Sequence, residues 1–131
     1  MDYSNNQTPI GVAIAGLGFG ESVHLPALKE NTDFKVISLW HPRRERLKEA
    51  SIKHSINVQN DWNALLEDKN IKAIVIATPP EPRFKLAYQA LKAGKHLLLE
   101  KPVSITEDEV AELHRLAIGE QLSVGVDFEY R

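Results

Sequence analysis

The chain has 131 residues, enough for one domain that buries roughly two thirds of its unfolded surface without a disulfide or metal. Its 16 basic and 18 acidic residues give a formal net charge of −2, which excludes the strongly basic surface typical of proteins that bind nucleic acid or anionic membranes. The absence of cysteine excludes thiol catalysis, cysteine-ligated zinc and disulfides, and is compatible with the cytoplasmic location that we expect. No apolar run approaches the roughly 20 residues that span a bilayer, so no membrane association is expected.

The first predicted element is a buried strand over Ile10–Ala15, a nearly continuous run of β-prone apolar residues. The polar residues 1–9 before it show neither a basic nor an apolar segment, so we expect a flexible tail rather than a signal peptide or anchor. Three glycines, Gly16, Gly18 and Gly20, end the strand. Gly16 permits a tight turn, and Gly18 lets a ligand approach the backbone.

Amides at the start of the following helix, predicted from Glu21 to about Asn31, would point at an anion such as a pyrophosphate. The match to the dinucleotide-binding pattern G-x-G-x-x-G is partial, because its third glycine would fall at Glu21. A plain tight turn therefore remains the alternative. Val23, Leu25 and Leu28 are expected to pack inward, and His24 is interpreted as structural rather than as a metal ligand or base, because no second ligand stands at metal-binding spacing.

The second strand is predicted over residues 34–40 and leads into His41, Arg43 and Arg44. In a dinucleotide-binding fold, an acidic residue at this strand end would bind the adenosine ribose and repel a 2′-phosphate. Here two guanidinium groups would pair with that phosphate, which favours NADP over NAD. The alternative is that the arginines belong to the solvated face of a helix that runs to about Ser51.

The rest of the chain continues to alternate strands with helices, and a doubly wound parallel α/β sheet of strand order 3-2-1-4-5-6, the Rossmann arrangement, is therefore predicted. Core contacts are expected from Trp62, Leu65 and Leu66 on the third helix, and the later inward-facing positions are Phe84, Ala87, Leu91, Val110, Leu113 and Ala117. The expected strands lie at 56–58, 72–77, 95–99 and 122–126, and the expected helices at 61–66, 82–93 and 106–119.

Two strand ends carry unusual loops. The strand ending at Ala77 runs into Thr78, Pro79 and Pro80, and the next strand ends at Glu100 and Lys101. Ligands of open α/β sheets bind at such carboxyl ends, and right-handed crossovers place both ends beside the glycine turn. Partial desolvation there would fit Lys101 for proton transfer. Taken alone, Glu100-Lys101-Pro102 is more typical of an ordinary charged turn, and its position at the strand end is what favours the functional interpretation.

In order, the motifs Gly-Leu-Gly-Phe-Gly (16–20), His-Leu-Pro (24–26), Ala-Thr-Pro-Pro (77–80), Ala-Leu-Lys-Ala-Gly-Lys-His (90–96) and Glu-Lys-Pro (100–102) resemble one family. It comprises the oxidoreductases named for glucose-fructose oxidoreductase, inositol 2-dehydrogenase and the rhizopine-catabolism protein. The resemblance covers nearly the whole chain and implies a dinucleotide-binding domain over residues 10–127.

The resemblance also implies roles for individual residues. The pyrophosphate would lie on the glycine loop, formed by Gly16, Gly18, Phe19 and Gly20. The ribose and nicotinamide would be bordered by Thr78, Pro79, Pro80 and Glu100. Lys101 would bind substrate and relay a proton while hydride passes between nicotinamide and a carbon bearing a hydroxyl. The chain departs from the family pattern at Pro80 and Arg83, where Asn and His are usual, and at Glu21, where a small residue is usual.

Members of the family carry a second, α+β domain that completes the active site and the oligomer interface. We expect that domain to be missing, with residues 128–131 as the start of the link to it, so that this chain by itself is inactive. The full-length protein is expected to be a homo-oligomer acting on a sugar, a polyol or a related hydroxy or keto compound, with no metal. The alternative is a regulatory protein that senses dinucleotide without turnover, like a galactose-pathway repressor of the same family.

Overall fold

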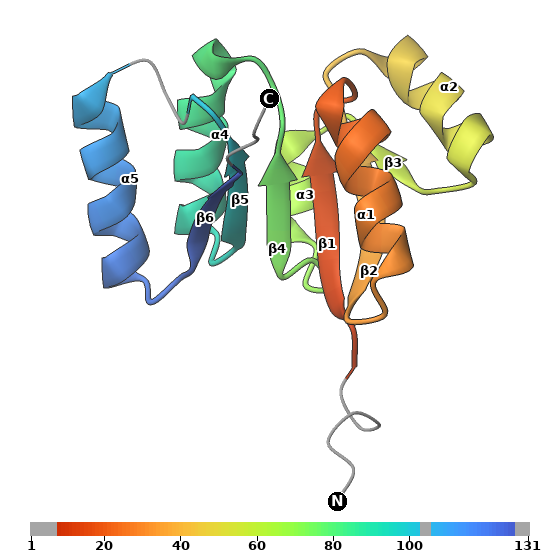
Figure 1. Ribbon diagram of the computed structural model, residues 1–131. Helices are drawn as coiled ribbons and strands as arrows, with labels where there is room; N and C mark the ends of the chain where they lie inside the picture. Colours follow the sequence, from red (N-terminus) through yellow and green to blue (C-terminus); the bar gives the residue numbers. More distant parts are fainter. Residues whose placement is uncertain (1–7, 103–105, 128–131) are drawn as a thin grey trace, which may run out of the picture.

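The structure, a computed structural model, describes residues 8–102 and 106–127. Most of the expected tail, 1–7, and the expected link, 128–131, lie outside the described residues. Six parallel strands form one sheet in the order β3-β2-β1-β4-β5-β6, as predicted (Figure 1). The strands are β1 Ile10–Ala15, β2 Phe34–Trp40, β3 Val58–Gln59, β4 Ala73–Ile76, β5 His96–Glu100 and β6 Val124–Asp127.

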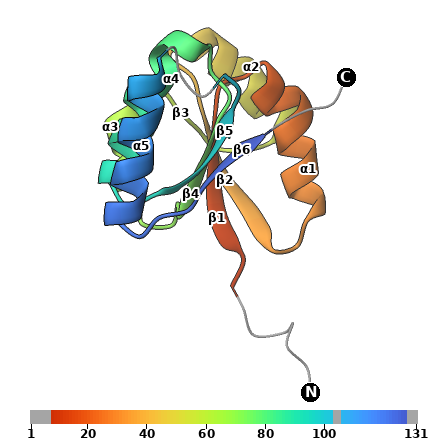
Figure 2. The same cartoon turned by 60° about the vertical axis from the view of Figure 1, so that its left-hand side comes forward.

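Helices cover both faces of the sheet (Figure 2). The helical segments are the π-helix η1 Gly20–His24, and the α-helices α1 Leu25–Glu30, α2 Arg44–His54, α3 Trp62–Glu67, α4 Pro80–Lys92 and α5 Glu107–Gly119. Helices α1 and α2 lie on one face, and α3, α4 and α5 lie on the other. Both layers therefore shield the central strands from water, which explains why β1 and β4 read as continuous apolar runs.

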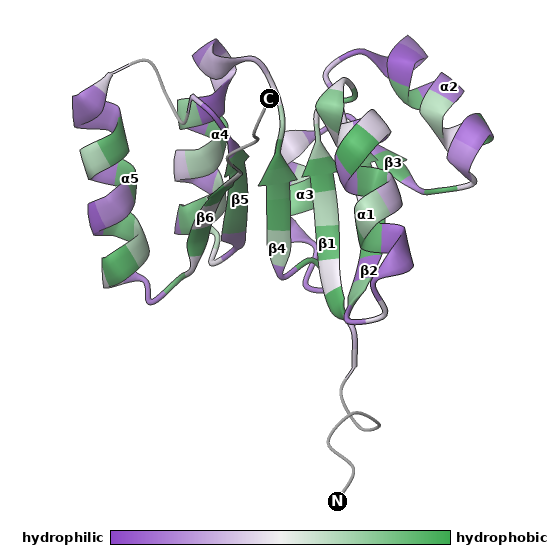
Figure 3. Cartoon of the chain, in the orientation of Figure 1, coloured by the Kyte–Doolittle hydropathy of each residue, from purple (hydrophilic) through white to green (hydrophobic). Residues whose placement is uncertain are grey.

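Alternate residues of β1 enter two separate cores. Val12 and Ile14 pack with residues of α1 and α2, whereas Ala13 and Ala15 belong to the larger cluster under α3, α4 and α5. The central strands are mostly hydrophobic, whereas hydrophilic and hydrophobic residues alternate along α2 and α5 (Figure 3). The burial of these apolar side chains supplies the main driving force for folding.

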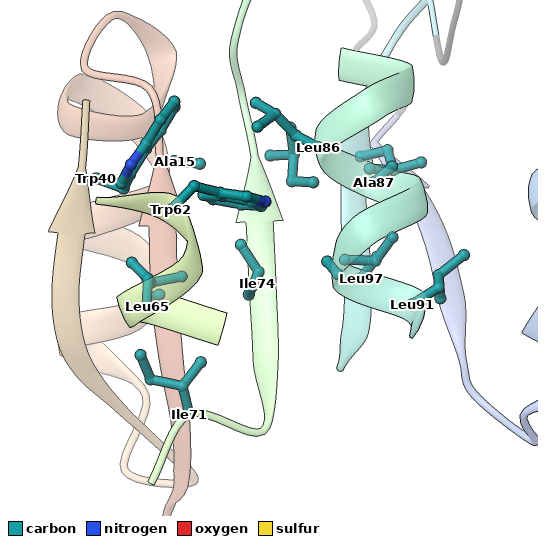
Figure 4. Close-up of a cluster of buried hydrophobic side chains, with 14 of the residues drawn as sticks. Ala15, Trp40, Trp62, Leu65, Ile71, Ile74, Leu86, Ala87, Leu91 and Leu97 are labelled. Atoms are coloured by element: carbon teal, nitrogen blue, oxygen red, sulfur yellow. The ribbon is translucent and has the colours of Figure 1, made fainter. Parts of the chain in front are cut away.

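The larger core contains both tryptophans of the chain. The rings of Trp40 and Trp62 meet edge to face, with centroids 4.9 Å apart, above Leu65 and Ile74 (Figure 4). The predicted packing of Trp62 and Leu65 is confirmed, since both are buried. Asp61 caps α3 as its carboxylate accepts the Ala64 N–H at 3.2 Å, and Thr106 caps α5 in the same way from Glu109.

Two inward positions were predicted wrongly. Val23 is 38% exposed and His24 is buried in its place, because the first helix begins as a π-helix in which the Leu25 N–H bonds to the Gly20 carbonyl. The wider turn rotates the buried face by one residue. Val110 is 43% exposed, whereas Leu113 and Ala117, farther along α5, are buried in the core and Leu116 packs against it.

Candidate functional site

The glycine turn after β1 lies at the carboxyl edge of the sheet. Gly16 has φ +104°, and a Cβ there would come within 2.7 Å of the Ala77 carbonyl oxygen at the end of β4. Only glycine suits this position, because the conformation and the space both exclude a side chain. At Gly18, by contrast, a Cβ would meet nothing within 4 Å. The backbone of Gly18 is therefore open to a ligand.

Gly20 performs the close packing that the pattern assigns to its third glycine. A Cβ there would come 2.8 Å from Cγ2 of Ile14, so the absence of a side chain lets η1 approach β1. Glu21 stands where the G-x-G-x-x-G pattern has its third glycine. Its carboxylate contacts α2, with Oε2 2.9 Å from Nε2 of His54. Phe19 is partly exposed, and its ring meets His24 edge to face at 6.4 Å.

A cleft of about 690 Å³ runs between this turn and the loops that follow β2 and β4. Its walls combine main chain, apolar side chains and basic groups, contributed by Gly16, Leu17, Gly18, Trp40, His41, Pro42, Arg43, Arg46, Ala77, Thr78, Pro79, Pro82 and Leu86. None of these lining residues is acidic. The volume lies within the range of small-molecule sites, and the position is the one where open α/β sheets bind ligands.

The end of the cleft beside β2 is basic. The Arg43 N–H donates to Nδ1 of His41 at 3.0 Å, so the ring proton of neutral His41 is on Nε2. Burial and the charges of Arg46 and Arg43 lower the pKa of His41, although the Arg43 hydrogen bond opposes the shift. Arg44 begins α2 and borders a separate hollow between α2 and β3. The structure thus brings Arg43 and Arg46 to the cleft, but not Arg44.

The loop after β4 forms the opposite wall. Thr78 is buried and Pro79 is exposed, and both line the cleft, whereas Pro80 is the first residue of α4. This helix starts two residues earlier than predicted, because proline fits the first turn of a helix, where no N–H is required. Arg83 then projects into the interior, where it is 4% exposed.

Strand β5 ends at Glu100, the second predicted strand end. Oε1 of Glu100 lies 2.5 Å from Nε2 of His24, and both side chains are nearly buried. Lys101 follows as an exposed residue, joined to Pro102 by a cis peptide bond. Neither Glu100 nor Lys101 lines the cleft itself, so they flank it from the β5 side.

Sequence reasoning missed three residues of this edge. His24 was interpreted as structural, and its contact with Glu100 was not predicted, although its place in the His-Leu-Pro motif was the available signal. Arg83 was noted only as a departure from the family pattern. Arg46 entered the sequence interpretation only in the alternative, together with Arg43 and Arg44, as part of a solvated helix face. In the structure it lies in the first turn of α2 and lines the cleft together with Arg43, the residue before that helix.

In residues 8–102 and 106–127, no group of three or more His, Asp or Glu side chains is placed to hold a metal ion. Over the same part of the chain, no helix is long and apolar enough to cross a membrane.

Comparison with known proteins identifies the family. Residues 10–128 match the model of the oxidoreductase family with an NAD-binding Rossmann fold, GFO_IDH_MocA. The chain belongs to this family. As a GFO_IDH_MocA domain, it has the family's nicotinamide-dinucleotide-binding fold, and the resemblance expected from its motifs is confirmed.

Relatives of known name extend this result. An uncharacterized oxidoreductase of Synechocystis sp., sll0816, is 36% identical over all of this chain and 35% of its own length. A galactose 1-dehydrogenase of Pseudomonas fluorescens is 33% identical over 79% of this chain and 30% of its own. The structure of a Synechocystis sp. biliverdin reductase with biliverdin and NADP+ superposes with a TM-score of 0.86 at 27% identity, covering 92% of this chain and 38% of that one. The chain thus spans about a third of the length of these proteins.

Proposed function

We propose that this domain binds NADP in preference to NAD and serves an oxidoreductase acting on a sugar, a polyol or a related hydroxy or keto compound. The carrying observation is the basic end of the cleft. Arg43, which follows β2, and Arg46, on α2, both line it, and among the residues that the structure describes no acidic side chain does. A ribose 2′-phosphate would be paired there, and a carboxylate that repels it is lacking.

In this proposal the dinucleotide extends along the cleft. The open backbone at Gly18 would receive the pyrophosphate, with the start of η1 supplying N–H groups and a favourable dipole. Thr78 and Pro79 would border the nicotinamide half, with Glu100 and Lys101 beside it. When bound, the nicotinamide supplies hydride transfer. The residues of this chain would hold the cofactor. The Lys101 ammonium would bind the substrate and move a proton to or from the substrate oxygen.

The proposed substrate class comes from the sequence motifs and from the names of relatives. The galactose 1-dehydrogenase among the relatives is named for a sugar, whereas the biliverdin reductase structure holds a different compound. Because the relatives are about three times as long as this chain, we propose that polypeptide beyond residues 10–127 supplies the groups completing the substrate pocket and the oligomer interface. This chain by itself is then expected to oxidise no alcohol, and turnover by it in a dehydrogenase assay would contradict the proposal.

Cofactor titration tests the preference directly. The absorption of NADPH overlaps the emission of Trp40, which lines the cleft, so energy transfer from tryptophan reports binding. NADPH should bind at least tenfold more tightly than NADH. Arg43→Ala should remove most of this difference, and Arg44→Ala, whose residue does not line the cleft, should remove less.

Arg115→Ala, an exposed arginine on α5, is the control that leaves the preference unchanged. Equal affinity of the unaltered chain for the two cofactors would overturn the NADP assignment. Absence of binding to either would overturn the assignment of a cofactor domain.

A further inference from the structure

Arg83 joins the two loops that flank the cofactor cleft on the β4 and β5 side. It lies in the first turn of α4, and its guanidinium donates to the main-chain carbonyls of Thr78, Glu100 and Pro102, at 2.6 Å for Glu100. Thr78 follows β4, whereas Glu100 and Pro102 belong to the end of β5. One buried side chain therefore ties together the loops of two neighbouring strands.

His24 holds the same turn from the other face of the sheet. Nε2 of His24 lies 2.5 Å from Oε1 of Glu100, and the two side chains are 8% and 12% exposed. An ionised carboxylate only accepts hydrogen bonds, so Nε2–H is the donor. Glu100 is consequently bound twice, through its main-chain carbonyl by Arg83 and through its carboxylate by His24.

Burying the Arg83 guanidinium costs free energy of folding, because the charged group loses its hydration. Burial lowers the pKa of Arg83, and the Glu100 carboxylate partly offsets that shift. Nε of Arg83 is buried without a hydrogen-bond partner in the structure. A desolvated guanidinium with an unsatisfied nitrogen is expensive, and such groups in native proteins call for an explanation. Its three carbonyl partners all lie in the segments that flank the cleft.

We propose that Arg83 and His24 are positioning residues, which clamp the Glu100–Lys101 turn against the Thr78 loop and thereby place the Lys101 ammonium beside the nicotinamide half of the cleft. The inference rests on the proposed function, since it assigns these loops to the nicotinamide. The proposed role is consistent with an arginine at position 83, because one guanidinium can donate to the Thr78 loop and to the Glu100–Lys101 turn at the same time.

The first experiment separates the two halves of the cofactor. NADPH and 2′-phospho-ADP-ribose share the adenosine, the 2′-phosphate and the pyrophosphate, but only NADPH carries nicotinamide. Arg83→Lys keeps the charge and cannot span both loops, so it should weaken NADPH binding about tenfold and change the affinity for 2′-phospho-ADP-ribose less than twofold. Arg115→Lys is the control. Equal losses for both ligands, or no loss for either, would overturn the positioning role.

The second experiment needs no cofactor. After reductive ¹³C-methylation, the Lys101 signal, assigned by its loss in Lys101→Arg, should shift in Arg83→Lys and in His24→Ala but not in Arg115→Lys. His24→Gln, which retains a donor near the place of Nε2, should restore the original signal. If Arg83→Lys does not fold, the two His24 variants decide the question alone. An unmoved Lys101 signal in folded variants would contradict the proposal.

The two experiments also separate this inference from the proposed function. An unaltered chain that binds no NADPH would refute the proposed function, and the Lys101 signal would still determine whether Arg83 and His24 place the lysine.

Discussion

The two edges of the sheet each bury a cation, and they use it differently. At the amino edge, Lys95 is 7% exposed and its Nζ donates to the carbonyls of Asp68 and Ile71, at 2.9 and 2.6 Å. Both acceptors belong to the single connection between α3 and β4. At the carboxyl edge, Arg83 reaches carbonyls in two separate loops beside a cleft.

The difference indicates what each edge is built for. Lys95 closes one short loop, and its pKa is lowered by burial and by Lys72, with Asp68 acting in the opposite direction. We expect a cation that bonds within one loop to contribute to stability. A cation that joins two loops next to a cleft also determines where the residues of those loops stand. Substitutions at the amino edge should therefore alter the free energy of unfolding without altering cofactor affinity. Substitutions at exposed positions of the carboxyl edge should alter cofactor affinity without altering the free energy of unfolding.

The largest effect on stability is expected at the carboxyl edge, where the sheet itself is engaged. Gly16→Ala should lower the free energy of unfolding by about 3 kcal/mol, because it adds backbone strain to a clash with the Ala77 carbonyl. Urea denaturation measures the loss. Gly94→Ala is the matched control, since Gly94 has φ +81° but open space around a Cβ. Equal losses in both variants would show that strain alone acts at Gly16.

The next effect belongs to the amino edge. Lys95→Met should cost about 2 kcal/mol of unfolding free energy, because two carbonyls lose a charged donor. The dissociation constant for NADPH should stay within twofold when measured well below the melting temperature. Lys92→Met, at an exposed position of α4, should change neither quantity. A weakened NADPH affinity in Lys95→Met would contradict the separation of the two edges.

Gly18→Ala should separate binding from stability at the carboxyl edge. Its Cβ meets no protein atom within 4 Å, so unfolding free energy should change by less than about 0.5 kcal/mol. NADPH affinity should fall about tenfold, or roughly 1.4 kcal/mol, because the methyl group occupies the approach of the pyrophosphate. Gly119→Ala, equally free of contacts at the end of α5, should leave the affinity unchanged. Unaltered binding in Gly18→Ala would place the pyrophosphate elsewhere.

The smallest effect concerns the pH dependence of cofactor choice. Burial and two arginines lower the pKa of His41, and a 2′-phosphate beside it would raise that pKa again, so binding would take up a proton. The ratio of NADP+ to NAD+ affinity should therefore rise about two- to threefold as the pH falls through the range between the lowered His41 pKa of the free protein and its raised pKa in the NADP+ complex. His41→Asn, which retains an acceptor for the Arg43 N–H, should reduce this rise when both cofactors are titrated by calorimetry. A rise of the same size in the variant would exclude His41.

Much of the fold follows from local sequence patterns. The alternation of apolar runs and capped helices predicted all six strands and their order, because each run marks a buried strand and right-handed crossovers restrict its neighbours. The core positions Trp62, Leu65, Ala87 and Leu91 followed from helical spacing. Errors arose where backbone geometry departs from the standard helix, as at Val23.

Local sequence patterns predicted only part of the candidate site. The sequence by itself determined the glycine turn and the strand ends at Thr78 and Glu100, since turn chemistry and strand length are local properties. Only the tertiary structure decided that Gly20 packs against β1, that Arg46 rather than Arg44 lines the cleft, and that His24 and Arg83 meet at Glu100. Those contacts join residues up to 76 positions apart. Their geometry depends on the π-helical turn and on the packing of α4, which no local pattern of residues encodes.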